Sequence, residues 1–289
     1  MNIGILNTYW LKEWRADYLP FIKQARRIGC DVLELSIADE DGTDRKAWKT
    51  LGEAATGEGI LLTAAMGLSD ETSISSADRE TAARGVDILA RVSERIAAGG
   101  LTSLSGVLYS ACPGSVSTIE EKKAHWNRSV ENMRKVARAA ANYGVTINVE
   151  VLHRFEGFLL NTAAEAVQYC KDVGEPNIKV LMDTYHMNME EASFSGALIT
   201  AGTYLGELHV GEYNRGLPGY GRLPWTEIAA GLHAIGYEGN VIAEPFVQYG
   251  SRVGTDVKLF HPLYSTLDEA RLDEMGAESI AFLRRILTN

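Results

Sequence analysis

Short apolar runs alternate with amphipathic stretches along the whole chain of 289 residues. The apolar runs predict strands at 3–7, 31–37, 60–67, 103–109, 145–151, 178–183, 205–211 and 240–245. The stretches between them predict helices at 16–28, 44–57, 76–98, 118–142, 163–172, 190–199, 225–235 and 267–287. Strands that are each followed by a helix are typical of a (β/α)8 TIM barrel, a fold of the α/β class. We therefore expect residues 1–289 to form a single barrel domain with its active site at the C-terminal ends of the strands.

The alternative fold is an open, doubly wound sheet. Such a sheet would need a glycine-rich phosphate-binding turn after its first strand. The chain reads Asn-Thr-Tyr-Trp at 7–10, which is not a turn of that kind. The barrel is therefore the favoured interpretation.

Two local signals mark the ends of the predicted helices. Ser117 and Glu120 have the spacing of a capping box at the start of the helix at 118–142. Glycines follow four helical stretches, where a left-handed residue commonly ends a helix. They are Gly29, Gly144, Gly174 and Gly236.

Four consecutive predicted strands, the fifth to the eighth, have an acidic or imidazole side chain at or near their downstream ends. These residues are Glu150, Asp183, His209 and Glu244. A strand buried on both faces is apolar, so a charge at its end is costly unless it is used there. Because the ends of barrel strands meet at one mouth, we expect the four side chains to converge. Three carboxylates and an imidazole suit a divalent cation such as Mn²⁺ or Mg²⁺, and the two glutamates could also transfer protons.

Charge and composition exclude several classes of partner. The net charge of −10 argues against nucleic acid and anionic membranes, which require basic surfaces. Three scattered cysteines are too few for a disulfide framework and fit a reducing compartment. We find no signal peptide and no apolar stretch of about 20 residues that could span a bilayer. We therefore expect a cytoplasmic protein with no membrane or nucleic-acid partner.

The loops after the strands add polar and aromatic groups to the same mouth. Their motifs are Glu-Val-x-x-Arg-Phe-Glu at 150–156, Asp-Thr-Tyr-His-Met-Asn at 183–188, His-Val-Gly-Glu-x-Asn-Arg at 209–215, Pro-Gly-x-Gly-Arg-Leu-Pro-Trp at 218–225 and Glu-Pro-Phe at 244–246. Arg215 and His186 could hold hydroxyl or carbonyl oxygens of a polyol, and Trp14 and Phe246 could pack on its carbon faces. These motifs resemble the ketose 3-epimerases, the family of D-tagatose 3-epimerase and D-psicose (D-allulose) 3-epimerase. The similarity covers nearly the whole chain.

The resemblance implies a metal-dependent isomerase that acts on free ketoses such as D-tagatose, D-fructose or D-psicose, and L-ribulose. It implies that Mn²⁺, or Co²⁺ or Mg²⁺, is bound by Glu150, Asp183, His209 and Glu244. It makes Glu150 and Glu244 the catalytic pair. The residues that match the family's contacts to substrate oxygens are Glu156, His186 and Arg215. A homodimer or homotetramer is also implied.

This assignment is chemically coherent. A metal bound to O2 and O3 of a ketose would polarise the C2 carbonyl and stabilise the enediolate that forms when the C3 proton leaves. Epimerisation requires a proton to return to the opposite face of that planar intermediate. One base does not easily reach both faces, whereas Glu150 and Glu244 on opposite sides could.

Three other functions remain open from the residues. A related isomerase, acting on hydroxypyruvate or converting aldoses to ketoses, could use the same two glutamates to move a proton between C1 and C2. A phosphodiester-cleaving barrel of the endonuclease IV type would need several metals, more histidine ligands and a basic surface. A sugar-binding protein without activity would not need both glutamates.

The chain departs from the family pattern at three places. Leu6 stands where many members have an aromatic residue, and Cys112 stands before Pro113 where a tryptophan is usual. His153 stands where asparagine is common. Leu6 and Cys112 would change the apolar wall around the far end of a sugar. These departures bear on the preferred substrate and not on the metal or the catalytic pair.

Overall fold

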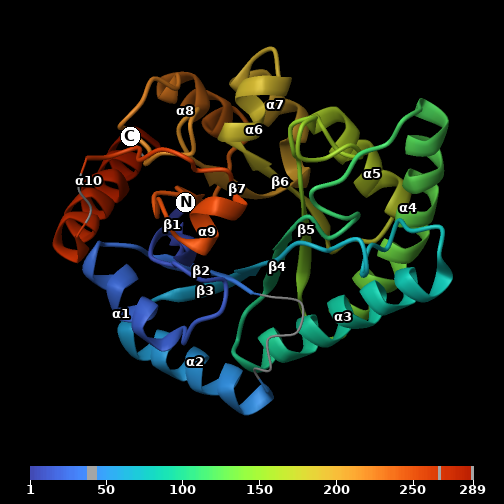
Figure 1. The fold of residues 1–289 in the computed structure, drawn as a ribbon, viewed down its shortest axis with the longest axis horizontal. Coiled ribbons are helices and arrows are strands. Elements are labelled where there is room, and N and C mark those ends of the chain that lie inside the picture. Colours follow the sequence, from blue (N-terminus) through green and yellow to red (C-terminus); the bar gives the residue numbers. More distant parts are fainter. Residues whose placement is uncertain (38–43, 266–267, 288–289) are drawn as a thin grey trace.

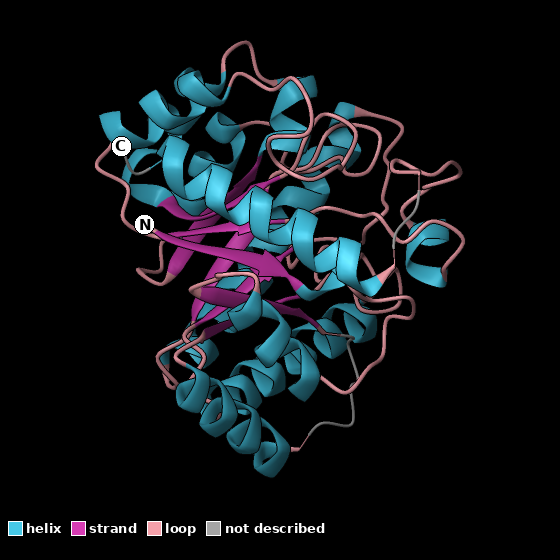
Figure 2. Ribbon diagram, turned by 90° about the vertical axis from the view of Figure 1, so that its left-hand side faces the viewer, coloured by secondary structure: helices cyan, strands magenta, loops and turns pink. Residues whose placement is uncertain are grey.

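The computed structural model describes residues 1–37, 44–265 and 268–287. Within these residues, parallel strands β1 to β8 close into a barrel in sequence order, which confirms the predicted (β/α)8 fold. Figure 2 shows the strands in the interior with helices around them. The strands are β1 (Asn2–Leu6), β2 (Val32–Ser36), β3 (Leu61–Ala65), β4 (Ser103–Gly106), β5 (Thr146–Glu150), β6 (Ile178–Asp183), β7 (Leu205–Val210) and β8 (Asn240–Ala243).

Helices surround the strands, as the view in Figure 1 shows. They are α1 (Leu19–Arg27), α2 (Arg45–Glu58), α3 (Arg79–Ala98), α4 (Ile119–Ala141), α5 (Ala163–Val173), α6 (Thr184–Glu190), α7 (Phe194–Ala201), α8 (Trp225–Ala234), α9 (Arg252–Asp256) and α10 (Glu269–Leu287). Two short 3-10 helices, Asn7–Tyr9 and Gly202–Tyr204, follow β1 and precede β7. The predicted start of the last helix at residue 267 lies outside the described residues.

The helix predicted at 190–199 is present as α7 at Phe194–Ala201, but a further helix before it, α6, was not predicted. Helix α6 begins immediately after β6, where the Asp183 side chain accepts a hydrogen bond from the backbone N–H of Tyr185. The extended backbone of Glu191 ends α6, and the Ser193 side chain caps α7. Asp183 was predicted only as the end of a strand, and its second role as a helix cap was not predicted.

The predicted capping box at the start of α4 is displaced by one residue. Thr118, and not Ser117, accepts a hydrogen bond from the Glu121 backbone, and the Glu121 side chain accepts one from the Thr118 backbone. The glycine prediction is confirmed. Gly29, Gly144, Gly174 and Gly236 all have positive φ values, between 61° and 88°.

A short helix that the sequence did not predict, α9, follows β8 and helps to build one wall of the barrel mouth. Its Val253 packs with Leu11 and Phe246 in a small apolar cluster, against which Trp14 and Val257 also pack. Trp14 and Val257 line the cavity described below. None of the helices in the described ranges is long and apolar enough to cross a membrane.

A glycine in α3 sets the position of the loop after β3, which forms another wall of that cavity. Gly85 is buried, and a Cβ atom there would overlap the carbonyl oxygen of Thr72. Thr72 lines the cavity together with Leu68 and Ser69. Close packing of α3 against this loop therefore depends on the absence of a side chain at Gly85.

We expect Gly85→Ala to lower the free energy of unfolding by about 1–3 kcal/mol, because overpacked interiors cost this much. Gly57→Ala is the matched control. It lies on the exposed side of α2 with no atom within 4 Å of the added Cβ, so it should be neutral or stabilising by up to about 1 kcal/mol. Denaturant titration of both variants measures the difference. Equal stabilities would contradict the role of Gly85.

Candidate active site

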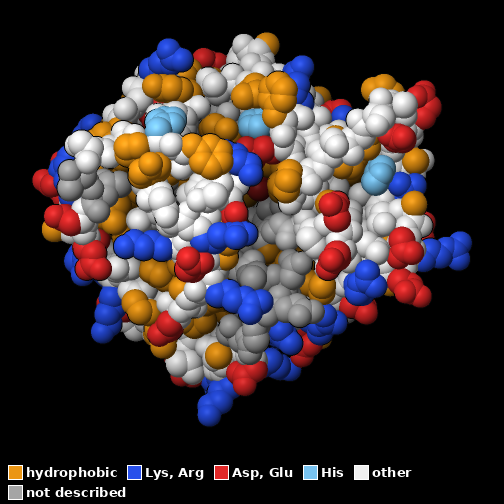
Figure 3. Space-filling model, viewed as in Figure 1, with side chains coloured by type: hydrophobic (Ala, Val, Ile, Leu, Met, Phe, Trp, Pro, Cys, Tyr) orange, Lys and Arg blue, Asp and Glu red, His pale blue; other side chains and the backbone are white. Residues whose placement is uncertain are grey.

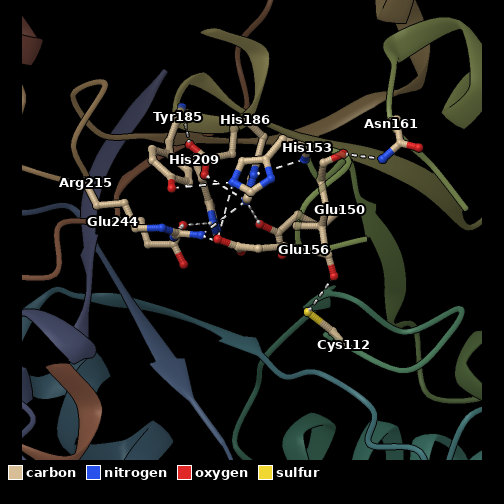
Figure 4. Close-up of polar contacts among 12 residues, drawn as sticks. Cys112, Glu150, His153, Glu156, Asn161, Tyr185, His186, His209, Arg215 and Glu244 are labelled. Carbon is tan, nitrogen blue, oxygen red and sulfur yellow. Dashed lines mark hydrogen bonds and ion pairs between the residues drawn. The ribbon is translucent and has the colours of Figure 1, made fainter. Parts of the chain in front are cut away.

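The four residues at the strand ends converge at the C-terminal mouth of the barrel, where Figure 4 shows Glu150, His209 and Glu244 close together. Glu150 and Asp183 end β5 and β6, His209 is opposite Asp183 in the β6–β7 register, and Glu244 follows β8. Ligand atoms of Glu150, His209 and Glu244 all lie within 4.8 Å of one another. A second group, whose ligand atoms also lie within 4.8 Å of one another, consists of Glu150, Asp183 and His186.

Several polar atoms of this cluster are buried without a hydrogen-bond partner among the described residues. They are Asp183 Oδ2, both ring nitrogens of His209 and Glu244 Oε2. His209 Nδ1 and Glu244 Oε2 are 3.4 Å apart. Unpaired buried polar atoms are costly unless something satisfies them. A divalent cation could satisfy them, because carboxylate and imidazole groups are ligands that such ions accept.

His186 enters the same cluster from α6. Its Nε2 lies 3.7 Å from Glu150 and 3.6 Å from Asp183. Its Nδ1 accepts a hydrogen bond from the backbone N–H of His153. Burial, and then the positive charge of Arg215, lower the pKa of His186 well below its usual value. Arg215 Nη2 also approaches Nε2, at 3.4 Å, but a neutral ring accepts at one nitrogen only, and the shorter contact at Nδ1 leaves the proton on Nε2. His186 therefore offers a hydrogen-bond donor to the site.

Arg215 is fixed on several sides. Its guanidinium lies 3.0 Å from Glu156 and 3.6 Å from Glu244. It also lies over the rings of Tyr185 and Phe246, at 4.1 and 5.1 Å from their centres. Its backbone has a φ of 59°, an uncommon value for a residue with a side chain. Such a conformation persists only where the surroundings enforce it, which is consistent with a functional position.

The loop that carries Arg215 is anchored by a buried glutamate that the sequence analysis quoted only as part of a motif. The Glu212 carboxylate accepts hydrogen bonds from the backbone N–H groups of Gly219, Arg222 and Leu223 and from the indole of Trp225. Because one carboxylate satisfies four donors, the loop has a fixed path from β7 to α8. The fixed path in turn positions Arg215.

The two strand-end glutamates have opposite electrostatic environments. Burial, and then the nearby Glu244 carboxylate, raise the pKa of Glu150 well above its usual value. Burial alone would also raise the pKa of Glu244, but His209 and Arg215 outweigh burial and hold it below its usual value. Two carboxylates with pKa values shifted apart are suited to opposite roles as acid and base.

The other charged groups of the cluster respond to the same surroundings. Burial raises the pKa of Asp183 to about 7, with Glu244 adding to the effect. Burial would lower the pKa of His209, but Glu34 and Glu244 raise it well above its usual value. Burial would raise the pKa of Glu156, yet His153 and Arg215 hold it below its usual value. Protons therefore occupy part of the cluster near neutral pH when no cation is bound.

A cavity of about 840 Å³ opens above this cluster. Trp14 and Phe246, which we predicted to contact substrate, both line it, although the Trp14 indole also donates to Asp256. Leu6 and Cys112, the two departures from the family pattern, line it as well. Among the residues predicted to bind substrate oxygens, the structure brings together Glu156, His186 and Arg215.

Sequence reasoning did not assign a site role to two neighbours of His186. His153 lies 3.3 Å from Glu156 and contacts the Tyr185 ring, and Tyr185 supports Arg215. Tyr185 is in a quoted motif, and His153 was named only as a departure from the family pattern. Neither has the signal of a charge at a strand end.

On the face shown in Figure 3, acidic and basic side chains are interspersed over the described part of the chain.

Comparison with known proteins gives the family. Residues 22–285 match the xylose isomerase-like TIM barrels. The D-psicose 3-epimerase of Ruminiclostridium cellulolyticum is 40% identical over 287 residues, which cover 99% of this chain and 98% of that protein. The D-psicose 3-epimerase of Agrobacterium fabrum is 39% identical and matches over 99% of both chains. A crystal structure of D-psicose 3-epimerase with D-tagatose, from Clostridium cellulolyticum, has a TM-score of 0.96 and 40% identity, with 99% of both chains covered.

These matches confirm the resemblance predicted from the motifs and the prediction of an isomerase. The barrel, the buried cluster at its mouth and the full-length similarity agree with one another. The chain belongs to the xylose isomerase-like TIM barrels and, within them, to the ketose 3-epimerases.

Proposed function

We propose that this protein catalyses the metal-dependent epimerisation of free ketoses at C3. The observation that carries the proposal is the pair Glu150 and Glu244, which face one buried site with pKa values shifted in opposite directions. Relatives named for D-psicose and L-ribulose support the class of substrate. We propose D-tagatose, the D-fructose and D-psicose pair, and L-ribulose as candidate substrates.

We propose Mn²⁺ as the cofactor, with Co²⁺ or Mg²⁺ as substitutes. Glu150, Asp183, His209 and Glu244 would hold the ion. The unpaired atoms of Asp183, His209 and Glu244 support this ligand set. His186 fits it less well, because its Nδ1 already accepts a backbone hydrogen bond and its Nε2 then carries the proton. When bound, the cation would act as a Lewis acid that polarises the C2 carbonyl and stabilises negative charge next to C3.

The two glutamates would transfer the proton. In one direction the ionised carboxylate removes the C3 proton and leaves an enediolate. The protonated carboxylate then returns a proton to the opposite face of C3. In the reverse direction the two residues exchange roles. The separated pKa values of Glu150 and Glu244 support a starting state with one protonated and one ionised group.

Glu156, His186 and Arg215 would bind the oxygens of the sugar. Their contacts with one another support this proposal, because Arg215 and Glu156 are already paired at 3.0 Å. Trp14 and Phe246 would pack on the carbon faces. Leu6 and Cys112 would replace the aromatic wall that the family commonly has, so the end of the sugar beyond C3 would be less tightly enclosed. A homodimer or homotetramer remains a prediction from the resemblance.

The proposed reaction predicts a specific product pattern. Incubation of the purified protein with D-fructose, D-tagatose, D-psicose and L-ribulose plus Mn²⁺ should yield C3 epimers, which chromatography separates. Aldoses without C3 epimers would instead establish the alternative of an aldose–ketose or hydroxypyruvate-type isomerase. No conversion of any sugar would favour a binding protein.

The two-glutamate mechanism predicts that both carboxylates are required. We expect Glu150→Gln and Glu244→Gln each to lower kcat by about 10²–10⁴-fold, the range that general acid–base groups contribute. Glu238→Gln is the control, because the Glu238 side chain is 88% exposed and contacts only the N-terminal amino group of Met1 among the ion pairs of the described residues. Circular dichroism verifies folding. Full turnover by either site variant would contradict the proposed mechanism.

Metal binding should be pH-dependent. Because burial raises the pKa of Asp183 to about 7 and also raises that of Glu150, protons compete with the cation at and below neutral pH. We expect Mn²⁺ affinity to rise between about pH 6 and 8, by up to about tenfold per pH unit for each proton displaced.

Calorimetry in buffers of different ionisation enthalpy counts the released protons. Asp183→Asn should bind Mn²⁺ more weakly and with a smaller pH dependence. A Mn²⁺ affinity that does not change with pH would contradict the proposal that buried carboxylates bind the ion.

Chelator treatment should abolish epimerisation, and added Mn²⁺ should restore it.

A further inference from the structure

A layer of buried polar side chains lies inside the barrel, one step below the strand ends that form the site. Asn148 and Glu207 are two residues upstream of Glu150 and His209 on the same strands. Side chains two residues apart on a strand point to the same side, so these groups face the barrel interior beneath the cluster. Glu34 in β2 belongs to the same layer and, like Glu207, is fully buried.

Most of this layer is hydrogen-bonded within itself. Ser105 donates to Glu207 Oε1 at 2.5 Å, and Asn148 donates to Ser105 at 3.1 Å. Thr63 donates to Glu34 Oε1 at 3.3 Å. Glu34 Oε2 has no such partner among the described residues. One carboxylate oxygen in the layer is therefore left for something else.

That oxygen faces the imidazole of His209. Glu34 Oε2 lies 2.7 Å from His209 Nε2, a hydrogen-bond distance, although the ring N–H is not aligned with the oxygen. The other ring nitrogen, Nδ1, lies 3.4 Å from Glu244 Oε2 on the side of the candidate metal site. The ring thus connects the buried layer to the cluster above it, with one nitrogen toward each.

We propose that Glu34 is a positioning residue for His209. Its carboxylate accepts the Nε2 proton of the imidazole, which fixes the ring orientation and leaves the unprotonated Nδ1 facing Glu150 and Glu244. A histidine that binds a metal commonly donates its other N–H to a carboxylate in this way, and loss of that partner weakens metal binding by about 10–100-fold. The inference rests on the proposed metal-dependent function, but metal affinity tests it without turnover.

Glu34 is a better partner for His209 than the other buried carboxylate. Glu207 Oε1 is 3.8 Å from His209 Nε2 and already accepts the short hydrogen bond from Ser105. The three groups Glu34, Glu207 and His209 are close enough to suggest a second cation. A second cation at Nε2 would, however, require the ring to lose both protons while Nδ1 binds the first. A protonated Nε2 directed at Glu34 avoids that requirement.

The test compares Mn²⁺ dissociation constants of the full-length protein by isothermal calorimetry. Glu34→Gln keeps the shape of the side chain and removes its charge, so a merely space-filling role would leave Kd unchanged. We expect a rise in Kd of about 10–100-fold. Glu34→Ala removes the acceptor entirely and should bind more weakly still. The matched control, Glu207→Gln, makes the same change beside the same histidine and should alter Kd by less than about threefold.

The outcomes separate this inference from the proposed function. Equal Kd values for the unsubstituted protein and Glu34→Gln overturn the role of Glu34 and leave the epimerase proposal intact. An equal loss in Glu207→Gln also overturns it, because the effect would then not be specific to Glu34. Two Mn²⁺ ions per chain would point to a second metal site instead. A protein that binds no Mn²⁺ yet forms C3 epimers would overturn this inference and the metal requirement together.

A second measurement does not depend on whether the Glu34 and Glu207 variants fold. Nitrogen NMR of ¹⁵N-histidine in the unsubstituted protein with diamagnetic Mg²⁺ reports which ring nitrogen carries a proton. His209 is assigned by the loss of its signals in His209→Asn. We expect a proton on Nε2 and none on Nδ1. A proton on Nδ1 would overturn the assignment of Glu34.

Discussion

The concentration of buried carboxylates at one end of the barrel is the constraint on which the rest of the site depends. Asp183 is buried, and Glu150 and Glu244 lie close to the same site with only about a tenth of their surface exposed. Like charges in such surroundings cannot all remain ionised without a compensating positive charge. Arg215 and His209 supply part of it, but burial and the neighbouring Glu244 carboxylate still raise the pKa values of Glu150 and Asp183. A divalent cation would supply the rest. The clustered carboxylates are therefore the source both of the electrostatic cost and of the proposed metal chemistry.

The loops around the cluster make this arrangement rigid. Glu212 binds four donors of the loop after β7, and that loop holds Arg215 in an uncommon backbone conformation against Tyr185 and Phe246. The backbone N–H of His153 selects the tautomer of His186. Glu34 extends the same principle below the cluster. The proposed transfer of a proton across two faces of one carbon would need fixed groups, because small displacements of reacting groups cost large factors in rate.

The fold was predictable because its signal is local and repeated. Each strand of the barrel is a short apolar run, and each is followed by helical periodicity. One failure occurred where a single residue serves two elements. Asp183 ends β6 and caps α6, so the chain enters a helix at once, and this helix was not predicted. The short helix α9 has too few residues for a periodic pattern, and its position depends on packing against Leu11 and Phe246.

For the site, the sequence by itself determined the residues with a charge at a strand end, because such a charge is anomalous in a buried strand wherever the strand lies. The sequence also identified the family, through motifs at the strand ends and in the loops that follow them. Only the tertiary structure decided which atoms meet. Glu34 carried the same signal, a charge within an apolar run, but its partner His209 is far away in sequence and adjacent only across the closed barrel. The direction of each pKa shift likewise depends on burial and on neighbours from several strands, which no linear pattern specifies.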